Sequence, residues 1–194
     1  MFKVTRKATR KATRKVTRKV TREATRKVTR KVTRKAIKQI QHHHMLIRME
    51  TMLCPKKTDI SKVKQLIKKI LVDIDMKLIG TPHVYYVDVP KANKGITSVS
   101  SIQTSHISFH FWNTPDNGIL QNPKSKCLLQ FDIYTCGTLT KHQANIVLQH
   151  LSVYIPTHIN IDILNRKTRL KIEHHMHWND NGKSTYENWL QSNV

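Results

Sequence analysis

The strongest structural pattern in the chain lies in residues 104–112, which read Thr104-Ser105-His106-Ile107-Ser108-Phe109-His110-Phe111-Trp112. Apolar and polar side chains alternate here, with Ile107, Phe109 and Phe111 on one side of an extended chain and the histidines on the other. Alternation with a period of two predicts a half-buried β-strand. One face of this strand is therefore expected to pack into a core, and the other to carry polar chemistry.

A second strand is predicted at residues 128–134, and it is followed by Thr135-Cys136-Gly137. This places a cysteine at a strand end, close in sequence to a serine and two histidines. Such combinations are common, so spacing alone is compatible with packed, hydrogen-bonded side chains as well as with an active site.

The rest of the chain adds two helices and further strands. Apolar residues at helical spacing predict helices over residues 58–77 and 140–151, the second with a capping box formed by Thr140 and Gln143. Further strands are predicted at residues 45–50, 84–89, 96–102, 159–163 and, as an edge strand or loop, around 174–178. The order predicts an α+β fold, an antiparallel or mixed β-sheet with both helices packed on one face.

A basic repeat occupies the N-terminus. From Lys3 onward the unit Lys-Val/Ala-Thr-Arg recurs eight times, with Glu23 in place of one lysine. Residues 1–41 hold 17 Lys and Arg and one Glu, so they carry a net charge of +16 out of the +23 of the whole chain. A period of four leaves no lasting apolar stripe on a helix, and we predict a disordered tail at residues 1–41 followed by a folded domain at residues 42–194.

Three interpretations of the tail stay open. Its charge is typical of a tether to nucleic acid or another acidic surface. Its Arg- and Thr-rich composition is also compatible with a targeting peptide. The third interpretation is a tandem expansion without a role.

The three cysteines, Cys54, Cys127 and Cys136, have no paired spacing, which argues against a disulfide framework and a zinc site and favours a reducing compartment. No apolar run is long enough to span a bilayer, and the N-terminus lacks the apolar core of a secretory signal. We therefore expect a soluble, cytoplasmic protein. The neighbouring histidines 42–44 should alternate between two strand faces, and those at 175 and 177 lack other ligands, so no metal site is predicted.

The runs Gly95-Ile96-Thr97, residues 104–112 and Phe131-Asp132-Ile133-Tyr134-Thr135-Cys136-Gly137 together resemble the prokaryotic-type S-adenosylmethionine decarboxylase family, whose members are pyruvoyl enzymes. The resemblance covers about residues 42–166. It implies self-cleavage between Thr104 and Ser105 that converts Ser105 into a pyruvoyl group, which acts as the electron sink in decarboxylation. It also implies a homodimer or higher oligomer in which two layers form a larger sandwich, with sites near the interface.

The resemblance assigns roles to other residues. His110 matches the histidine that helps withdraw the α-proton during processing, and Thr97 falls where the family has a processing serine. Cys136 matches the cysteine that returns a proton to the α-carbon after carbon dioxide leaves. Because Ser105 and His110 have opposite strand parity, a strained turn at Thr104-Ser105 is expected to bring them onto one face.

Besides Thr97, the chain departs from the family at three further positions. Thr104 replaces the usual Glu, Thr114 stands where an acid holds the ribose hydroxyls, and Lys91 stands where an aromatic residue stacks on adenine. Asp116 is a candidate to replace the acid, and Trp112 is a candidate to stack on the base, as are Tyr85 and Tyr86.

The expected activity is decarboxylation of S-adenosylmethionine, which supplies the aminopropyl donor for spermidine synthesis. Arginine or ornithine is the alternative substrate if the nucleoside pocket has been lost. A non-catalytic relative with a nucleic-acid-binding tail is the alternative from another functional class.

Overall fold

In the computed structural model the chain divides into two units, residues 1–39 and residues 40–194. The structure describes residues 18–19, 21–23, 40–89, 94–113, 115, 118–180 and 185–193. The described residues of the first unit are helical. The other residues up to 39 lie outside the described part. The predicted disorder of residues 1–41 and the three interpretations of the tail therefore stay predictions.

The second unit is built on one seven-stranded sheet with the order β2-β3-β4-β5-β1-β6-β7. Every neighbouring pair in this order is antiparallel. The strands are β1 (His43–Thr51), β2 (His83–Val87), β3 (Gly95–Ile102), β4 (Ser105–Trp112), β5 (Cys127–Thr135), β6 (Pro156–Asn165) and β7 (Lys171–Asn179).

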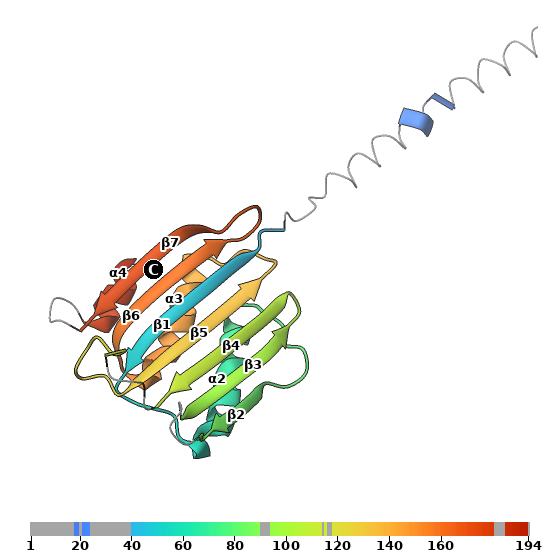
Figure 1. Cartoon of the computed structure of the whole chain (residues 1–194). Helices are drawn as coiled ribbons and strands as arrows, with labels where there is room; N and C mark the ends of the chain where they lie inside the picture. Colours follow the sequence, from blue (N-terminus) through green and yellow to red (C-terminus); the bar gives the residue numbers. More distant parts are fainter. Residues whose placement is uncertain are drawn as a thin grey trace, which may run out of the picture. The chain divides into compact units, whose positions relative to one another are not determined.

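Three described helices lie on one face of this sheet (Figure 1). They are α2 (Ile60–Asp73), α3 (Lys141–Leu151) and α4 (Tyr186–Asn193), with short 3-10 turns at Lys57–Asp59 and Ser152–Tyr154. The α3 helix begins at the predicted capping box, in which the Thr140 side chain accepts a hydrogen bond from Gln143 N. These elements confirm the α+β fold. They also add a terminal helix, α4, that was not predicted.

The apolar residues of each strand face the helices. In β4 the side chains of Ile107, Phe109 and Phe111 are buried in the same core as those of Val63 and Ile67 from α2. Burial of each of these aromatic rings contributes about 1.5–3 kcal/mol. Alternation along the strand then directs the intervening residues to the opposite side, which we call the open face. In β4 the open-face residues are His106, Ser108, His110 and Trp112.

A close backbone contact sets the start of β3. Gly95 has φ of 155°, and a Cβ atom on it would lie 1.8 Å from the carbonyl oxygen of Phe111. Only glycine allows β3 to begin this close to β4. The contact fixes the register that pairs Thr97 with His110.

The cysteine prediction was wrong, because Cys54 and Cys127 form a disulfide with a Cα–Cα distance of 5.8 Å. Sequence spacing did not reveal this pair because the two residues are 73 positions apart. The β1–β5 ladder pairs Thr51 with Cys127, which brings Cys54 beside it just after β1 ends. The predicted reducing compartment depended on unpaired cysteines, so it loses that support. Cys136 is the free cysteine of the described residues.

We expect reduction of this disulfide to lower the free energy of unfolding by about 2–4 kcal/mol, because the bridge closes a long loop in the unfolded chain. Urea unfolding of the oxidised and the reduced chain in a Ser105→Ala background, which keeps both cysteines in one chain, measures the difference. The same background carrying Cys54→Ala/Cys127→Ala is the control, since its unfolding should not respond to reductant. A Ser105→Ala midpoint that is equally unresponsive would contradict the prediction.

Within the described ranges, none of the helices combines the length and the apolar character that crossing a bilayer requires.

Candidate active site

The predicted scissile bond lies at a tight hairpin. Residues 103 and 104 form the turn between β3 and β4, and Ile102 pairs with Ser105 across it. The expected strained bend at Thr104-Ser105 is not found. Positive φ among described non-glycine residues is confined to His42, Asp75 and Ile155. Ser105 is instead the first residue of the regular strand β4, because the hairpin completes the chain reversal before it.

The carbonyl group of the scissile bond is held by the end of β5. Cys136 N donates a hydrogen bond of 3.1 Å to Thr104 O. The Thr104 hydroxyl lies 2.8 Å from Thr135 Oγ1, which also accepts a hydrogen bond from Gly137 N. A backbone N–H aimed at a carbonyl oxygen can stabilise the negative charge that nucleophilic attack would create there. The structure thus brings the predicted residues Thr104, Ser105 and Cys136 together.

A polar relay begins at the Ser105 hydroxyl. Ser105 Oγ lies 3.2 Å from His106 Nδ1, and His106 Nε2 lies 3.3 Å from Asp132 Oδ1. Ser108 Oγ donates a short hydrogen bond to the other carboxylate oxygen of Asp132. His44 Nε2 approaches Asp132 Oδ1 from the neighbouring strand, at 3.6 Å.

Charge and hydrogen bonds keep Asp132 ionised. Burial raises the pKa of its carboxyl, but the contacts with His44 and Ser108 and the nearby imidazole of His106 lower it by more, so the net pKa is below the usual value. The sequence alone does not indicate a role for His106, Asp132 or His44. One feature of the sequence does point to His106 and Asp132. Both lie at polar positions of predicted strands, and an antiparallel register between these strands places them on the same face.

A second group of predicted residues lies at the other end of β4. Thr97 pairs with His110 across β3 and β4, and the rings of His110 and Trp112 are 4.0 Å apart in an edge-to-face contact. Burial lowers the pKa of His110, so its imidazole is neutral at pH 7 and can accept a proton.

One chain does not bring these two groups together. Ser105 and His110 are five residues apart on a straight strand, which corresponds to about 16 Å, and their side chains have opposite parity. The predicted proximity of these two residues is therefore wrong within a single chain. Asp116 lies outside the described residues, as do Thr114 and Lys91.

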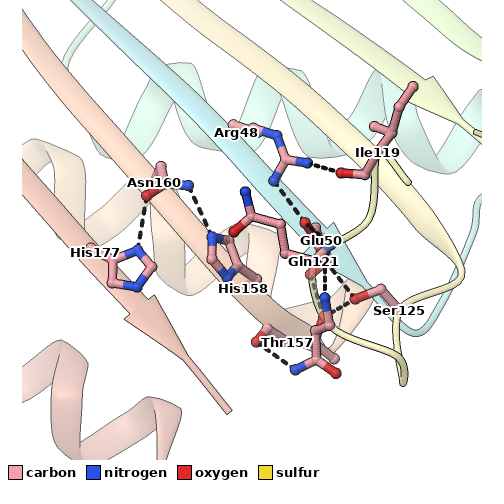
Figure 2. Close-up of polar contacts among 10 residues, drawn as sticks. Arg48, Glu50, Ile119, Gln121, Ser125, Thr157, His158, Asn160 and His177 are labelled. Atoms are coloured by element: carbon pink, nitrogen blue, oxygen red, sulfur yellow. Dashed lines mark hydrogen bonds and ion pairs between the residues drawn. The ribbon is translucent and has the colours of Figure 1, made fainter. Parts of the chain in front are cut away.

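A third polar network crosses the open face at the end of β1, where Figure 2 shows Arg48 and Glu50 pointing toward the loop that precedes β5. The fully buried Glu50 carboxylate accepts hydrogen bonds from Gln121 N, Asn122 N and Ser125 Oγ, and from Arg48 at 2.7 Å. Burial raises the pKa of Glu50, but these four donors together lower it below its usual value.

The histidines of β6 and β7 form contacts beside this network. His177 Nδ1 lies 2.8 Å from Asn160 Oδ1, and Asn160 Nδ2 lies 3.0 Å from His158 Nε2 (Figure 2). His175 pairs with Asp162 at 2.7 Å. In the described part of the chain, no three His, Cys, Asp or Glu residues are grouped so that they could hold a metal ion.

Comparison with protein families gives a match that covers most of the folded unit. The model of the family described as S-adenosylmethionine decarboxylase matches residues 43–167, which is more than half of the chain and includes every strand from β1 to β6. A comparison with curated proteins finds no match.

Proposed function

Because the chain belongs to the S-adenosylmethionine decarboxylase family, whose members are pyruvoyl-dependent decarboxylases, we propose that it cleaves itself before Ser105 and then decarboxylates S-adenosylmethionine. The product would be the aminopropyl donor for spermidine synthesis. The observation that carries the proposal is the hydrogen bond from Cys136 N to Thr104 O, directly beside the Ser105 hydroxyl.

The proposed cleavage follows from this arrangement. Ser105 Oγ attacks the carbonyl carbon of Thr104, the Thr104–Ser105 C–N bond breaks, and an ester replaces the peptide bond. Removal of the Ser105 α-proton then expels the Thr104 carboxylate. Hydrolysis of the remaining enamine releases ammonia and leaves a pyruvoyl group at position 105. The hydrogen bond from Cys136 N supports the first step, because it stabilises the oxyanion.

The residues around position 105 fit a pyruvoyl group. Pairing of Ser105 with Thr135 holds the start of β4 after the bond to Thr104 is cut, and Cys136 N and Thr135 Oγ1 supply polar partners. A pyruvoyl group supplies the electron sink that natural side chains lack for decarboxylation. The half-buried free thiol of Cys136 is one residue beyond Thr135, and we assign to it the return of a proton to the α-carbon of the substrate.

We further propose that two copies of the chain share each site. The open face exposes apolar side chains that a second copy would cover, with exposed fractions of 60% for Tyr85, 57% for Val99 and 55% for Ile172. If the two sheets pack with their strands in opposite directions, the start of one β4 strand lies opposite the end of the other. His110 and Thr97 of one copy would then approach the partner's site on its open face, where the Ser105 hydroxyl contacts His106.

Complementation between two inactive variants tests this arrangement. Each of Ser105→Ala and His110→Ala is expected to remain uncleaved alone. When the two are expressed together with different tags, the His110→Ala chain should be cleaved in mixed dimers, because its partner carries an intact His110. Cleavage of His110→Ala alone at the wild-type rate, or no cleavage in the mixture, would contradict the shared site.

Denaturing mass measurement tests the proposed processing. Reduced protein should give two fragments, residues 1–104 and 105–194, and the second should react with hydrazine-type carbonyl reagents. Without reductant, the fragments should stay joined, because Cys54 lies in one and Cys127 in the other. A reduced chain that stays intact at 22.7 kDa would instead favour a non-catalytic relative.

Carbon dioxide release from labelled substrates identifies the substrate. The family supports S-adenosylmethionine, and Trp112, half-buried on the open face, is the candidate stacking residue. Release from S-adenosylmethionine is the expected result. Release from arginine or ornithine instead would assign the same chemistry to a basic amino acid.

A further inference from the structure

We propose that His106, oriented by Asp132, is the catalytic base that activates the Ser105 hydroxyl for the first step of self-cleavage. This inference rests on the proposed self-processing and adds a residue that the family resemblance did not assign. The two steps of processing then use different histidines: His106 acts in ester formation, and His110 acts in the later elimination.

The contacts define a direction for proton transfer. The Asp132 carboxylate favours the tautomer of His106 that carries its proton on Nε2, 3.3 Å away, which leaves the Nδ1 lone pair toward Ser105 Oγ at 3.2 Å. Ser108 holds the other oxygen of Asp132 in place. A nucleophilic hydroxyl, an imidazole and a carboxylate in this order form an arrangement that activates serine.

The position of the Asp132 carboxylate, which is half-buried with its Oδ1 atom enclosed, supports this orientation. Asp132 Oδ1 is buried and has no hydrogen-bond partner among the described residues, yet it faces Nε2 of both His106 and His44. A buried carboxylate oxygen gains most from a neighbour that becomes positively charged. When His106 accepts the Ser105 proton, the positive charge that forms on its imidazole therefore faces this carboxylate oxygen. Tyr134 and Arg166 complete the surroundings, with the guanidinium of Arg166 stacked over the Tyr134 ring.

The step balances without an outside reagent. The Ser105 Oγ–H proton moves to His106 Nδ1 as Oγ bonds to the carbonyl carbon of Thr104. The carbonyl oxygen becomes an oxyanion that faces Cys136 N. As the C–N bond breaks, the proton passes from His106 to the departing nitrogen of residue 105, and the ester forms with no net change in charge.

His110 cannot perform this step in the same chain. It lies about 16 Å further along β4 and has the opposite parity to Ser105. His106 is the imidazole that contacts the hydroxyl, and no dimer is needed for that contact.

The test measures the rate at which fragments appear in freshly synthesised chain, under reducing conditions. We expect His106→Ala to cleave at least about 100-fold more slowly than wild type, the usual loss when a general base is removed. His106→Asn, which keeps a polar side chain of similar reach but cannot take up a proton, should be equally slow. Asp132→Asn should slow cleavage by at least about tenfold, because the preferred tautomer of His106 is lost.

The matched control is His175→Ala. His175 is also an exposed histidine paired with an aspartate, Asp162, but it lies on β7 at the far side of the open face. This variant should cleave at the wild-type rate. Thermal unfolding of all variants shows whether each one folds.

Two chemical readouts separate a catalytic from a structural role. Added imidazole should restore cleavage of His106→Ala by at least about tenfold, because it can occupy the vacated space and accept the proton. Hydroxylamine, which cuts esters but not amides, should leave uncleaved His106→Ala intact. The same reagent should split His110→Ala at position 105, because that variant is expected to stop after the ester has formed.

Each outcome bears on a distinct claim. If wild type and His175→Ala both fail to cleave, the proposed function fails, and the role of His106 fails with it. If wild type cleaves and His106→Ala cleaves within about threefold of it, only the role of His106 is overturned. Slow cleavage of His106→Ala that is accompanied by loss of folding and is not rescued by imidazole also overturns it.

Discussion

Replacement of Ser105 by alanine is expected to leave the chain in one piece, at 22.7 kDa under reducing and denaturing conditions. Alanine has no hydroxyl to attack the Thr104 carbonyl, so neither the ester nor the pyruvoyl group can form. Decarboxylation should disappear with it, because natural side chains offer no electron sink for that reaction. Intact mass, reaction with a hydrazine-type reagent and carbon dioxide release all report the loss.

Ser101→Ala is the matched control for this substitution. Ser101 lies on β3 in the same hairpin, is exposed, and pairs with His106 in the sheet. This variant should be processed like wild type. Fragments from the Ser105→Ala chain with the same cleavage position would contradict the assignment of Ser105, and an uncleaved Ser101→Ala chain would point to a general effect on the hairpin.

Periodicity predicted most of the fold. Alternation in β4 and helical spacing in α2 located both elements to within a few residues, because burial on one side of each element imposes a simple period. The capping box at Thr140 likewise predicted the start of α3. The terminal helix α4 was missed, because its eight residues are too few to display a clear period.

The candidate site was harder to predict because it depends on register. Resemblance identified Ser105, His110 and Cys136, but it did not show that the first two lie at opposite ends of β4. The pairing of Ser105 with Thr135 shows that Cys136 meets Thr104. The pairing of His106 with Tyr134 shows that Asp132 lies beside His106. The disulfide between Cys54 and Cys127 was missed for the same reason, since a ladder brings together residues that are distant in sequence.

The register also explains why the sequence does not predict the buried network of Glu50. It ends the predicted first strand as an isolated acid, and its donors Gln121, Asn122 and Ser125 lie in a loop about seventy residues later. In the structure this carboxylate is fully buried and ties that loop to β1 and to Arg48. A buried carboxylate with four donors is expected to be one of the most sensitive positions in the sheet.

Glu50→Gln is expected to lower the free energy of unfolding at pH 7 by about 3–5 kcal/mol, because it leaves Arg48 without its partner and turns an amide group toward backbone N–H donors. The measurement is urea unfolding in a Ser105→Ala background, where the chain stays in one piece. Glu173→Gln is the control. Glu173 is an exposed glutamate that pairs with the buried His43 at 3.3 Å, and because water still reaches its carboxylate, its loss should cost less than the loss of Glu50.

The lowered pKa of Glu50 also predicts how the difference in stability between the two chains changes with pH. The folded-state pKa of Glu50 is lowered, so its contribution to stability is fully present above about pH 4.5, the ordinary value, and is lost as the pH falls through the lowered folded-state pKa. The difference between the Glu50 chain and Glu50→Gln should therefore be large at pH 7 and shrink as the medium is made strongly acidic. A difference that stays constant across this range, or that grows on acidification, would mean that the Glu50 carboxylate is not held in its charged form by the four donors.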